Sequence, residues 1–251
     1  MENKPLVSII TPAYNCAKYI GETISSVISQ SFNDWEMIIV DDFSSDDTAK
    51  VVEEFVKQDN RIVLLKQETN LGCARARNRG LKAARGRYIT FLDGDDLLDS
   101  NYLESQLAFI KDNGPLITAS YRRLAPNSSS EFIVPDSANY KQTLKGCALS
   151  CLTTMFDKEV IGERFFLESM RKNEDFAFWL SILKEGYVVK GNKDVLASYR
   201  ILKTSKSHNK IKFIKHMWYV YRKVEHLNVF YSFHCLIHWA FYGLKKYKTV
   251  K

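Results

Sequence analysis

The first half of the chain alternates short apolar runs with segments of helical periodicity. Ile20, Ile24, Val27 and Ile28 share one helical face, which predicts a helix over residues 17–30, and further helices are expected over 49–57, 72–84 and 101–113. Continuous apolar strands that alternate with helices are typical of a parallel sheet covered on both faces, so we expect an α/β, Rossmann-like fold. The apolar runs that predict its strands are Leu6–Ile10, Glu36–Val40, Arg61–Leu65, Arg87–Leu92 and Pro115–Ser120.

The regular alternation stops near residue 118. The segment from Ala125 to Ser137 is rich in Pro, Asn and Ser, which predicts a surface loop. A further amphipathic helix is expected over Phe176–Leu183. Because 251 residues are near the upper size of one compact domain, we expect the second half to be an α+β portion that completes the same site.

Polar residues gather where the predicted parallel strands end. Thr11–Asn15 follows the first strand, Asp41 and Asp42 follow the second, and Asp93–Asp96 follows the fourth. Ligands of open parallel sheets bind at the carboxyl ends of the strands. We therefore expect these residues to converge on one rim.

The sequence Asp93-Gly94-Asp95-Asp96 places three carboxylates within four residues. A hard divalent cation with oxygen ligands relieves their mutual repulsion, and such a cation would bind a phosphate-bearing substrate. The alternative is an acidic turn that caps the helix beginning near Ser100. The chain contains neither G-x-G-x-x-G after its first strand nor a P-loop, so a metal-bridged diphosphate is the remaining way to hold phosphate.

The rim also carries groups suited to a nucleotide and to proton transfer. Tyr14 offers a flat ring for base stacking, and Asp42 could accept a hydrogen bond from a base N–H. A cation held by Asp95 would neutralise a diphosphate leaving group. An attacking hydroxyl must lose a proton, and the candidate base is Asp175, which follows Glu174 at a helix N-terminus that favours an ionised carboxylate. Plain helix capping is the alternative for this pair.

Residues 203–251 form a basic, aromatic tail with eleven Lys or Arg and one acidic residue, Glu225. Its nearly uncharged run Val229–Leu244 is shorter than the ~20 residues that span a bilayer. We expect the tail to lie on a membrane surface, with packing on the domain or a homodimer contact as alternatives. Nucleic acid is not an expected partner, because no nucleic-acid-binding motif is present. The residues at helical spacing on its interfacial face are Phe213, Met217, Trp218 and Tyr221.

The cysteines and the N-terminus indicate a compartment. The five cysteines form no C-x-x-C pair and no zinc spacing, which favours a reducing environment. The N-terminus shows no basic region followed by an apolar signal core. We therefore expect a cytoplasmic protein that is peripheral on the inner face of the plasma membrane.

Five sequence pieces, in this order, resemble family 2 glycosyltransferases of the GT-A fold, in particular the bacterial enzymes that build capsule, O-antigen or teichuronic-type polysaccharides. The resemblance implies a GT-A domain over residues 1–205, with a nucleotide-binding half over 1–117 and an acceptor-side half over 118–205, followed by the tail at 206–251. The matching pieces are Val7–Asn15, Ile38–Thr48, Asn70–Gly80, Asp93–Asp96 and Asn173–Asp175.

The resemblance also implies roles for individual residues. Asp95 would bind the metal, Mn²⁺ or Mg²⁺, and His208 would match a loop histidine that some relatives use as a further metal ligand. Asp175 would be the catalytic base of a single inverting displacement, which needs no protein nucleophile. Nucleotide contacts would come from Pro12, Ala13, Tyr14, Asp42, Arg77, Asn78, Asp93 and Gly94.

The sequence thus predicts a metal-dependent inverting glycosyltransferase that moves a sugar from a nucleotide-sugar, a UDP-sugar, to a lipid-linked saccharide acceptor. A sugar nucleotidyltransferase is an alternative, but it should open with a Gly-rich loop carrying Arg and Lys, which this chain lacks. The alternative from another class is a non-catalytic membrane or polysaccharide-binding scaffold of the same fold. Such a scaffold would bind no nucleotide and would tolerate Asp95→Asn.

Overall fold

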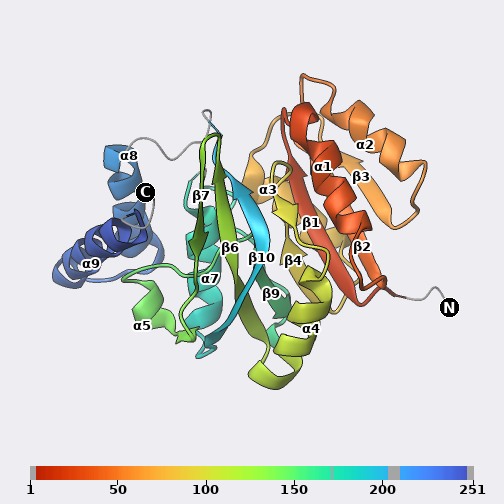
Figure 1. The fold of residues 1–251 in the computed structure, drawn as a ribbon. Helices are drawn as coiled ribbons and strands as arrows, with labels where there is room; N and C mark the ends of the chain where they lie inside the picture. Colours follow the sequence, from red (N-terminus) through yellow and green to blue (C-terminus); the bar gives the residue numbers. More distant parts are fainter. Residues whose placement is uncertain (1–3, 171, 203–209, 248–251) are drawn as a thin grey trace.

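The computed structural model describes residues 4–170, 172–202 and 210–247, and its first half is a regular alternation of strands and helices (Figure 1). The four strands and three helices predicted for this half are confirmed, with bounds that differ by a few residues at most. They are β1 (Val7–Ala13), α1 (Ala17–Ile28), β2 (Trp35–Asp41), α2 (Thr48–Val56), β3 (Ile62–Lys66), α3 (Cys73–Ala83) and β4 (Tyr88–Phe91).

These four strands are parallel and lie in the order β3-β2-β1-β4. Every residue of β2 is buried, because helices cover both faces of the sheet at this strand. Because these neighbouring strands run in the same direction, the carboxyl ends of β1, β2 and β4 lie at the same edge of the sheet. The predicted α/β class is confirmed, and so is the side of the sheet on which the polar strand ends meet.

The second half continues the same sheet instead of forming another one. β9 (Thr154–Asp157) runs antiparallel between β4 and β6 (Leu116–Ala125). β10 (Val189–Arg200) pairs in parallel with β6, and the short β5 (Leu97–Leu98) pairs with β10 at the edge. The acidic segment therefore connects β4, in the parallel first half of the sheet, to β5, at the edge of the second half.

The prediction of a surface loop over residues 125–137 is wrong for residues 128–132. Ser128–Phe132 forms strand β7, which pairs antiparallel with the end of β6, and β8 (Ser137–Ala138) pairs with β10. The serines of β7 are largely exposed, so the strand shows no apolar alternation in the sequence. Pairing with β6 through the backbone defines this strand, and the side chains give no signal of it.

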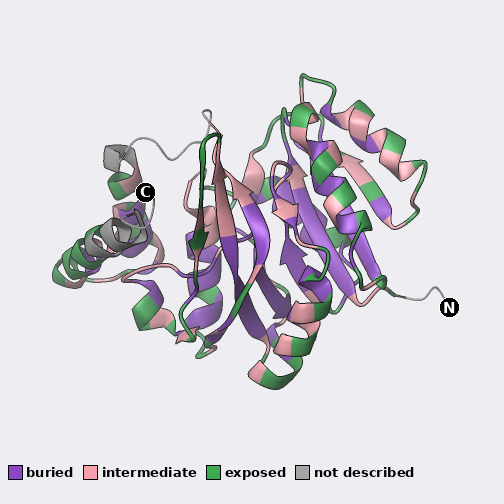
Figure 2. Cartoon of the chain, in the orientation of Figure 1, coloured by how far each residue is buried: buried purple, intermediate pink, exposed green. Residues whose placement is uncertain are grey.

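Two layers of helices enclose the sheet, and the strands between these layers are the most buried part of the molecule (Figure 2). One hydrophobic cluster joins the sheet to α1, α2 and α4 (Tyr102–Asn113), and another joins the opposite face to α3 and α7 (Glu174–Leu183). Phe178 and Trp179 of α7 pack on this second face, beside Phe91 of β4. The short helices α5 (Tyr140–Thr143) and α6 (Lys158–Ile161) complete the second half.

The tail consists of α8 (Lys210–Tyr219), a π-helical turn η1 (Val220–Val224) and α9 (Val229–Tyr247), at the end of the molecule remote from α2 and β3 (Figure 1). Met217 and Tyr221 are buried in a third cluster with Phe176 of α7, and the Tyr221 hydroxyl donates to the Leu144 carbonyl at 2.5 Å. These two side chains pack on the domain, which corrects their assignment to an interfacial face. None of the helices in the described part of the chain has both the length and the apolar character needed to cross a bilayer.

Candidate active site

The acidic segment after β4 is held by α1 and by β1. The Thr23 hydroxyl of α1 lies 2.8 Å from the Asp96 carbonyl and 3.2 Å from the Gly94 carbonyl. A Cβ at Gly94 would lie 2.9 Å from the Cys16 sulfur, so a larger residue would force the segment away from the end of β1. This close approach gives Gly94 a structural reason for being glycine, besides the nucleotide contact that the resemblance implies.

The carboxylates of this segment are crowded and poorly hydrated. Burial, together with the charge of Asp93, raises the pKa of Asp95 to about 6. The pKa of Asp96 is raised well above its usual value by burial and by the two neighbouring carboxylates, and its Oδ2 is buried without a hydrogen-bond partner. An excess of buried negative charge with an unpartnered oxygen is what a divalent cation would relieve, so the residues present fit a metal.

A metal at this segment would need ligands from outside the described side chains. Within residues 4–170, 172–202 and 210–247, no three His, Cys, Asp or Glu side chains form a metal-binding group. Mg²⁺ and similar cations are commonly held by one or two carboxylates together with substrate phosphates. Asp95 is suited to supply the protein's share, and a diphosphate to supply the rest. His208 lies outside the described residues, so its role as a further ligand stays a prediction.

The raised pKa of Asp95 gives a testable pH dependence. Below about pH 6 a proton occupies the carboxylate and competes with the cation, so Mn²⁺ affinity should fall by about tenfold per pH unit there and level off above about pH 7. Calorimetric titration of Mn²⁺ into the protein with a UDP-sugar, between about pH 5 and pH 8, measures this, because the diphosphate of a UDP-sugar, unlike the terminal phosphate of UDP, has no group that titrates in this range. An Asp95→Asn protein should show no such slope, and a flat profile in the unsubstituted protein would contradict the assignment.

Arg200, at the end of β10, lies beside the same carboxylates, and the sequence analysis did not single it out. Its backbone N–H donates to Asp96 Oδ1 at 2.9 Å, and its guanidinium pairs with Glu22 and lies over the Tyr19 ring at 5.4 Å. Its Nη1 is buried without a partner. Arg200 thus ties β10 to α1 and to the acidic segment. No local pattern marks it, because its neighbours come from distant parts of the chain.

The predicted base side of the nucleotide pocket lies at the ends of β1 and β2. The Tyr14 ring is exposed directly after β1, as stacking on a base requires, whereas Ala13 is buried and Pro12 half-buried. Asp42 Oδ1 accepts from Leu71 N–H at 2.8 Å and from Gln67 Nε2 at 2.5 Å, and its Oδ2 accepts from Gly72 N–H at 2.8 Å. Asp42 therefore fixes the segment before α3, and any hydrogen bond to a base would use its remaining acceptor capacity.

Arg77 of α3 joins the acidic segment to the start of α7. Its buried guanidinium pairs with Asp93 Oδ1 at 2.7 Å through Nη2 and with Glu174 Oε1 at 3.4 Å through Nη1. Glu174 is half-buried beside Asp175, and desolvation and the charge of Asp175 raise its pKa, whereas Arg77 lowers it. Arg77 therefore positions both the acidic segment, through Asp93, and the start of α7, through Glu174.

Asn78, the next residue, serves a different purpose. Its Nδ2 donates to the Phe166 carbonyl at 2.9 Å, and its Oδ1 accepts from the Phe166 N–H at 2.7 Å. These bonds fasten the segment before α7 to α3. The amide of Asn78 is thus occupied by the protein backbone, whereas the Tyr14 ring is exposed.

Asp175 lies in the first turn of α7, next to Glu174 and hence to the ion pair with Arg77. Its Oδ1 accepts from the Phe176 N–H at 2.8 Å, while Asn173 before it adopts a left-handed conformation with φ 57°. This bond fixes the position of the carboxylate, and a general base must be held within reach of the proton it takes. Capping of the helix and proton transfer are compatible, because a carboxylate has several acceptor positions.

Substituting Arg77 tests the link between the two sides. In Arg77→Met, Asp93 and Glu174 would face each other without a cation, which should destabilise the fold by about 3 kcal/mol and lower kcat/KM by about a hundredfold. Thermal unfolding and initial rates measure the two effects. Arg77→Lys should recover most of the stability but not the rate, since lysine lacks the planar fork. Arg79→Met, on the exposed side of the same helix, is the control; equal stability of Arg77→Met and the unsubstituted protein would contradict the role.

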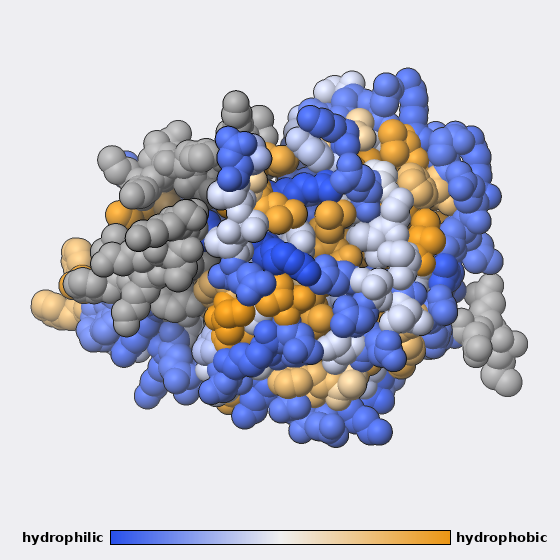
Figure 3. All heavy atoms as spheres, in the orientation of Figure 1, coloured by the Kyte–Doolittle hydropathy of each residue, from blue (hydrophilic) through white to orange (hydrophobic). Residues whose placement is uncertain are grey.

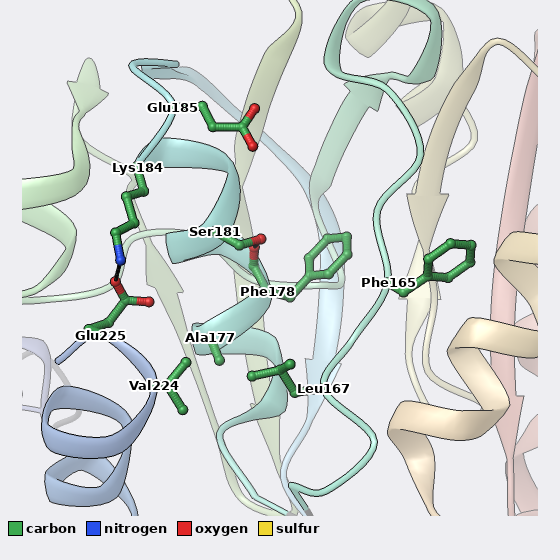
Figure 4. Close-up of a pocket in the computed structure, with 9 residues that line it drawn as sticks. All are labelled: Phe165, Leu167, Ala177, Phe178, Ser181, Lys184, Glu185, Val224 and Glu225. Carbon is green, nitrogen blue, oxygen red and sulfur yellow. Dashed lines mark hydrogen bonds and ion pairs between the residues drawn. The ribbon is translucent and has the colours of Figure 1, made fainter.

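A hollow of about 300 Å³ lies on the other side of α7, away from its first turn (Figure 4). Its walls combine apolar side chains with Ser181, Glu185 and the ion pair of 3.0 Å between Lys184 and Glu225. It contains none of the carboxylates of the acidic segment, and its residues come from α7, the segment before it and η1. We therefore assign the hollow to the contact between the tail and the domain, and not to the catalytic rim.

The mixed sheet with an acidic segment after its fourth strand has close structural counterparts among glycosyltransferases. The fold is similar to that of Staphylococcus aureus TarS 1-349 in complex with UDP-GlcNAc, with a TM-score of 0.71, 21% identity and coverage of 86% of this chain and 66% of that one. It is also similar to the mannosyltransferase PcManGT from Pyrobaculum calidifontis in complex with GDP-Man and Mn²⁺ (TM-score 0.68, 18% identity, 90% and 66% coverage). This chain spans about two thirds of the length of these solved chains. The fold is the GT-A fold.

Sequence comparison narrows this class to one family. Residues 8–159 match the model of glycosyl transferase family 2. The putative teichuronic acid biosynthesis glycosyltransferase TuaG of Bacillus subtilis is 40% identical over 247 residues, which cover 97% of this chain and 98% of that protein. The UDP-Glc:alpha-D-GlcNAc-diphosphoundecaprenol beta-1,3-glucosyltransferase WfgD of Escherichia coli is 40% identical over 216 residues, covering 85% and 84%. The chain belongs to glycosyl transferase family 2, and it is a glycosyltransferase.

Proposed function

We propose that this enzyme transfers one sugar from a UDP-sugar to a lipid-linked saccharide, with inversion at the anomeric carbon and with the help of Mn²⁺ or Mg²⁺. The observation that carries the proposal is the bridge that Arg77 makes between Asp93 and Glu174. It joins the segment suited to a metal and a diphosphate to the helix that bears Asp175. Both halves of a transfer reaction therefore belong to one site.

On the donor side, the Tyr14 ring stacks on the base, and Asp93 faces the ribose. Asp95, together with the donor's phosphates, would hold the cation, which would neutralise the charge of the leaving diphosphate. Asp93 is half-exposed and already bound to Arg77, so its carboxylate is oriented before a ribose hydroxyl reaches it. The relative from Escherichia coli uses UDP-Glc by its name, which supports a UDP-sugar donor.

On the acceptor side, Asp175 takes the proton of the attacking hydroxyl. One base and no protein nucleophile imply a single displacement, in which the hydroxyl enters opposite the leaving diphosphate and the anomeric configuration inverts. The named acceptor of the Escherichia coli relative is a saccharide on diphosphoundecaprenol, and the Bacillus subtilis relative is named for teichuronic acid biosynthesis. These names support a lipid-linked acceptor, a role in bacterial surface polysaccharide synthesis and a place on the inner face of the plasma membrane.

Thermal stabilisation by nucleotides tests the donor class. We expect UDP with Mn²⁺ to raise the unfolding temperature, and GDP, CDP or UDP without metal to raise it much less. UDP-sugars are then screened for metal-dependent hydrolysis and for transfer to a saccharide diphosphate carrying a short lipid. A larger shift with GDP or CDP would replace the UDP assignment, and no shift with any nucleotide would favour a non-catalytic scaffold.

A further inference from the structure

Helix α9 has two faces of different character. The side chains of Ser232 and Cys235 are buried, and the Trp239 ring lies edge-on to Phe176 of α7 at 6.0 Å. On the opposite side Phe230, Phe233 and Ile237 are 88%, 54% and 57% exposed. We refer to these three residues as the outer face of α9. Their spacing places them on one side of the helix, and that side is directed away from the domain (Figure 2).

The outer face adjoins helix α8. The ring centroids of Phe233 and Trp218 lie 4.8 Å apart, and Ile214 and Tyr219 of α8 are also exposed. In the space-filling view, hydrophobic side chains stand at the left edge of the molecule over α9 (Figure 3). Exposed apolar patches of this kind mark surfaces that bind a membrane or another macromolecule.

The positive charge of the tail favours a membrane over another macromolecule as the partner of the outer face. Glu225 is the one acidic residue between positions 203 and 251, and it is buried, where it pairs with Lys184 and accepts from the Tyr140 hydroxyl at 2.6 Å. The tail therefore presents lysines, such as the exposed Lys215 and Lys223, with no exposed carboxylate of its own to balance them. Exposed apolar side chains on a tail of net positive charge complement an anionic bilayer, whose headgroups attract lysine and whose interface accepts aromatic rings.

The contact between α9 and the domain fixes the orientation that a bound membrane would impose. Tyr221 and Glu225 bind Leu144 and Lys184, and Trp239 packs on Phe176, which directly follows Asp175. A bilayer at the outer face would therefore lie at a set distance from the catalytic rim. A lipid-linked acceptor reaching out of that bilayer would approach the same side of the protein every time.

We propose that the outer face of α9 is the membrane-docking surface of this protein and that it inserts Phe230, Phe233 and Ile237 into the interface of an anionic bilayer. The docking rests on the observed surface, and only its purpose, delivery of a lipid-linked acceptor, rests on the proposed function. A second copy of the chain is the competing occupant of the outer face, but two copies would bring two basic tails together.

Vesicle sedimentation of the full chain tests the proposal. The protein should bind vesicles of phosphatidylethanolamine and phosphatidylglycerol, bind phosphatidylcholine vesicles at least about tenfold more weakly, and lose affinity as salt is added. The triple variant Phe230→Ser, Phe233→Ser, Ile237→Ser should bind the anionic vesicles at least about tenfold more weakly. A control variant, Ile133→Ser with Val160→Ser, changes residues that are 51% and 52% exposed elsewhere and should bind like the unsubstituted protein.

Two further readouts separate the possible outcomes. Both variants should keep the unfolding temperature and the transfer rate to a water-soluble acceptor, which shows that the fold and the rim are intact. Equal vesicle binding by the triple variant, or none by the unsubstituted protein, overturns the proposal, and so does a dimer in light scattering that the triple variant converts to a monomer. Vesicle binding that depends on the outer face, in a protein without any transferase activity, would uphold the docking surface and reject the proposed function.

Discussion

Asp175→Asn is expected to lower kcat by about 10³-fold while leaving the affinity for UDP and Mn²⁺ within about twofold of the original value. Asparagine keeps the shape of the side chain and can still accept the hydrogen bond from the Phe176 N–H, so α7 should keep its first turn. It cannot take a proton from the acceptor hydroxyl. The loss should therefore fall on the chemical step and not on donor binding.

Initial rates with saturating donor, together with calorimetric titration of UDP, separate these two effects. Asp112→Asn is a matched control, because Asp112 is exposed near the end of α4 and carries the same chemical change. It should leave both quantities unchanged. A fully active Asp175→Asn enzyme would contradict the assignment of Asp175 as the catalytic base. A large loss of UDP affinity would show that Asp175 acts in binding.

Asp95→Asn is expected to remove metal-supported turnover, with a fall in kcat/KM of about 10³-fold, because the cation loses its carboxylate ligand. The same change should not weaken the fold. The pKa of about 6 means that the ionised carboxylate is disfavoured in the folded protein, and above that pH its charge costs up to about 3 kcal/mol of stability in the absence of a cation. A neutral asparagine relieves this cost, so without metal the variant should unfold at an equal or higher temperature.

The combination of higher stability and lost activity distinguishes a metal ligand from a structural residue. Unfolding temperatures at about pH 7.5, with and without UDP and Mn²⁺, should show stabilisation by the ligands in the unsubstituted protein and none in the variant. Asp59→Asn removes the ion-pair partner of Arg61, which lowers the pKa of Asp59, so this structural carboxylate should instead show a lower unfolding temperature when it is replaced. Retained metal-dependent turnover in Asp95→Asn would reject Asp95 as the metal ligand.

Much of this arrangement follows from local sequence. The apolar runs that became β1, β2 and β4 carry their periodicity and their polar ends in adjacent residues, so both the fold class and the common edge for Tyr14, Asp42 and Asp95 could be predicted. The acidic segment is equally local, since three carboxylates around one glycine repel each other wherever the chain places them. Strand β7 escaped prediction for the opposite reason, because its exposed serines carry no apolar alternation and its partner lies in β6.

The roles of individual polar residues depended on neighbours that are distant in sequence. Asp42 is turned toward Leu71 and Gly72, Asn78 toward Phe166, and Arg77 toward both Asp93 and Glu174. Nothing in the segment Asn70–Gly80 distinguishes an arginine that bridges two carboxylates from one that touches a ligand. Burial makes the difference, and burial is set by the packing of α3 between the sheet and the segment before α7.

Four features could be predicted from contiguous residues, namely the α/β class, the acidic segment at the end of the fourth strand, the carboxylate pair at the start of α7 and the basic charge of the tail. Three others depend on packing in space: Arg77 joins the acidic segment to α7, Arg200 ties β10 to Asp96, and Met217 and Tyr221 of the tail are buried while Phe230, Phe233 and Ile237 are exposed. The physical reason is that the energy of a buried charge or an apolar ring depends on what surrounds it in space, and those surroundings come from elements that the sequence places far apart.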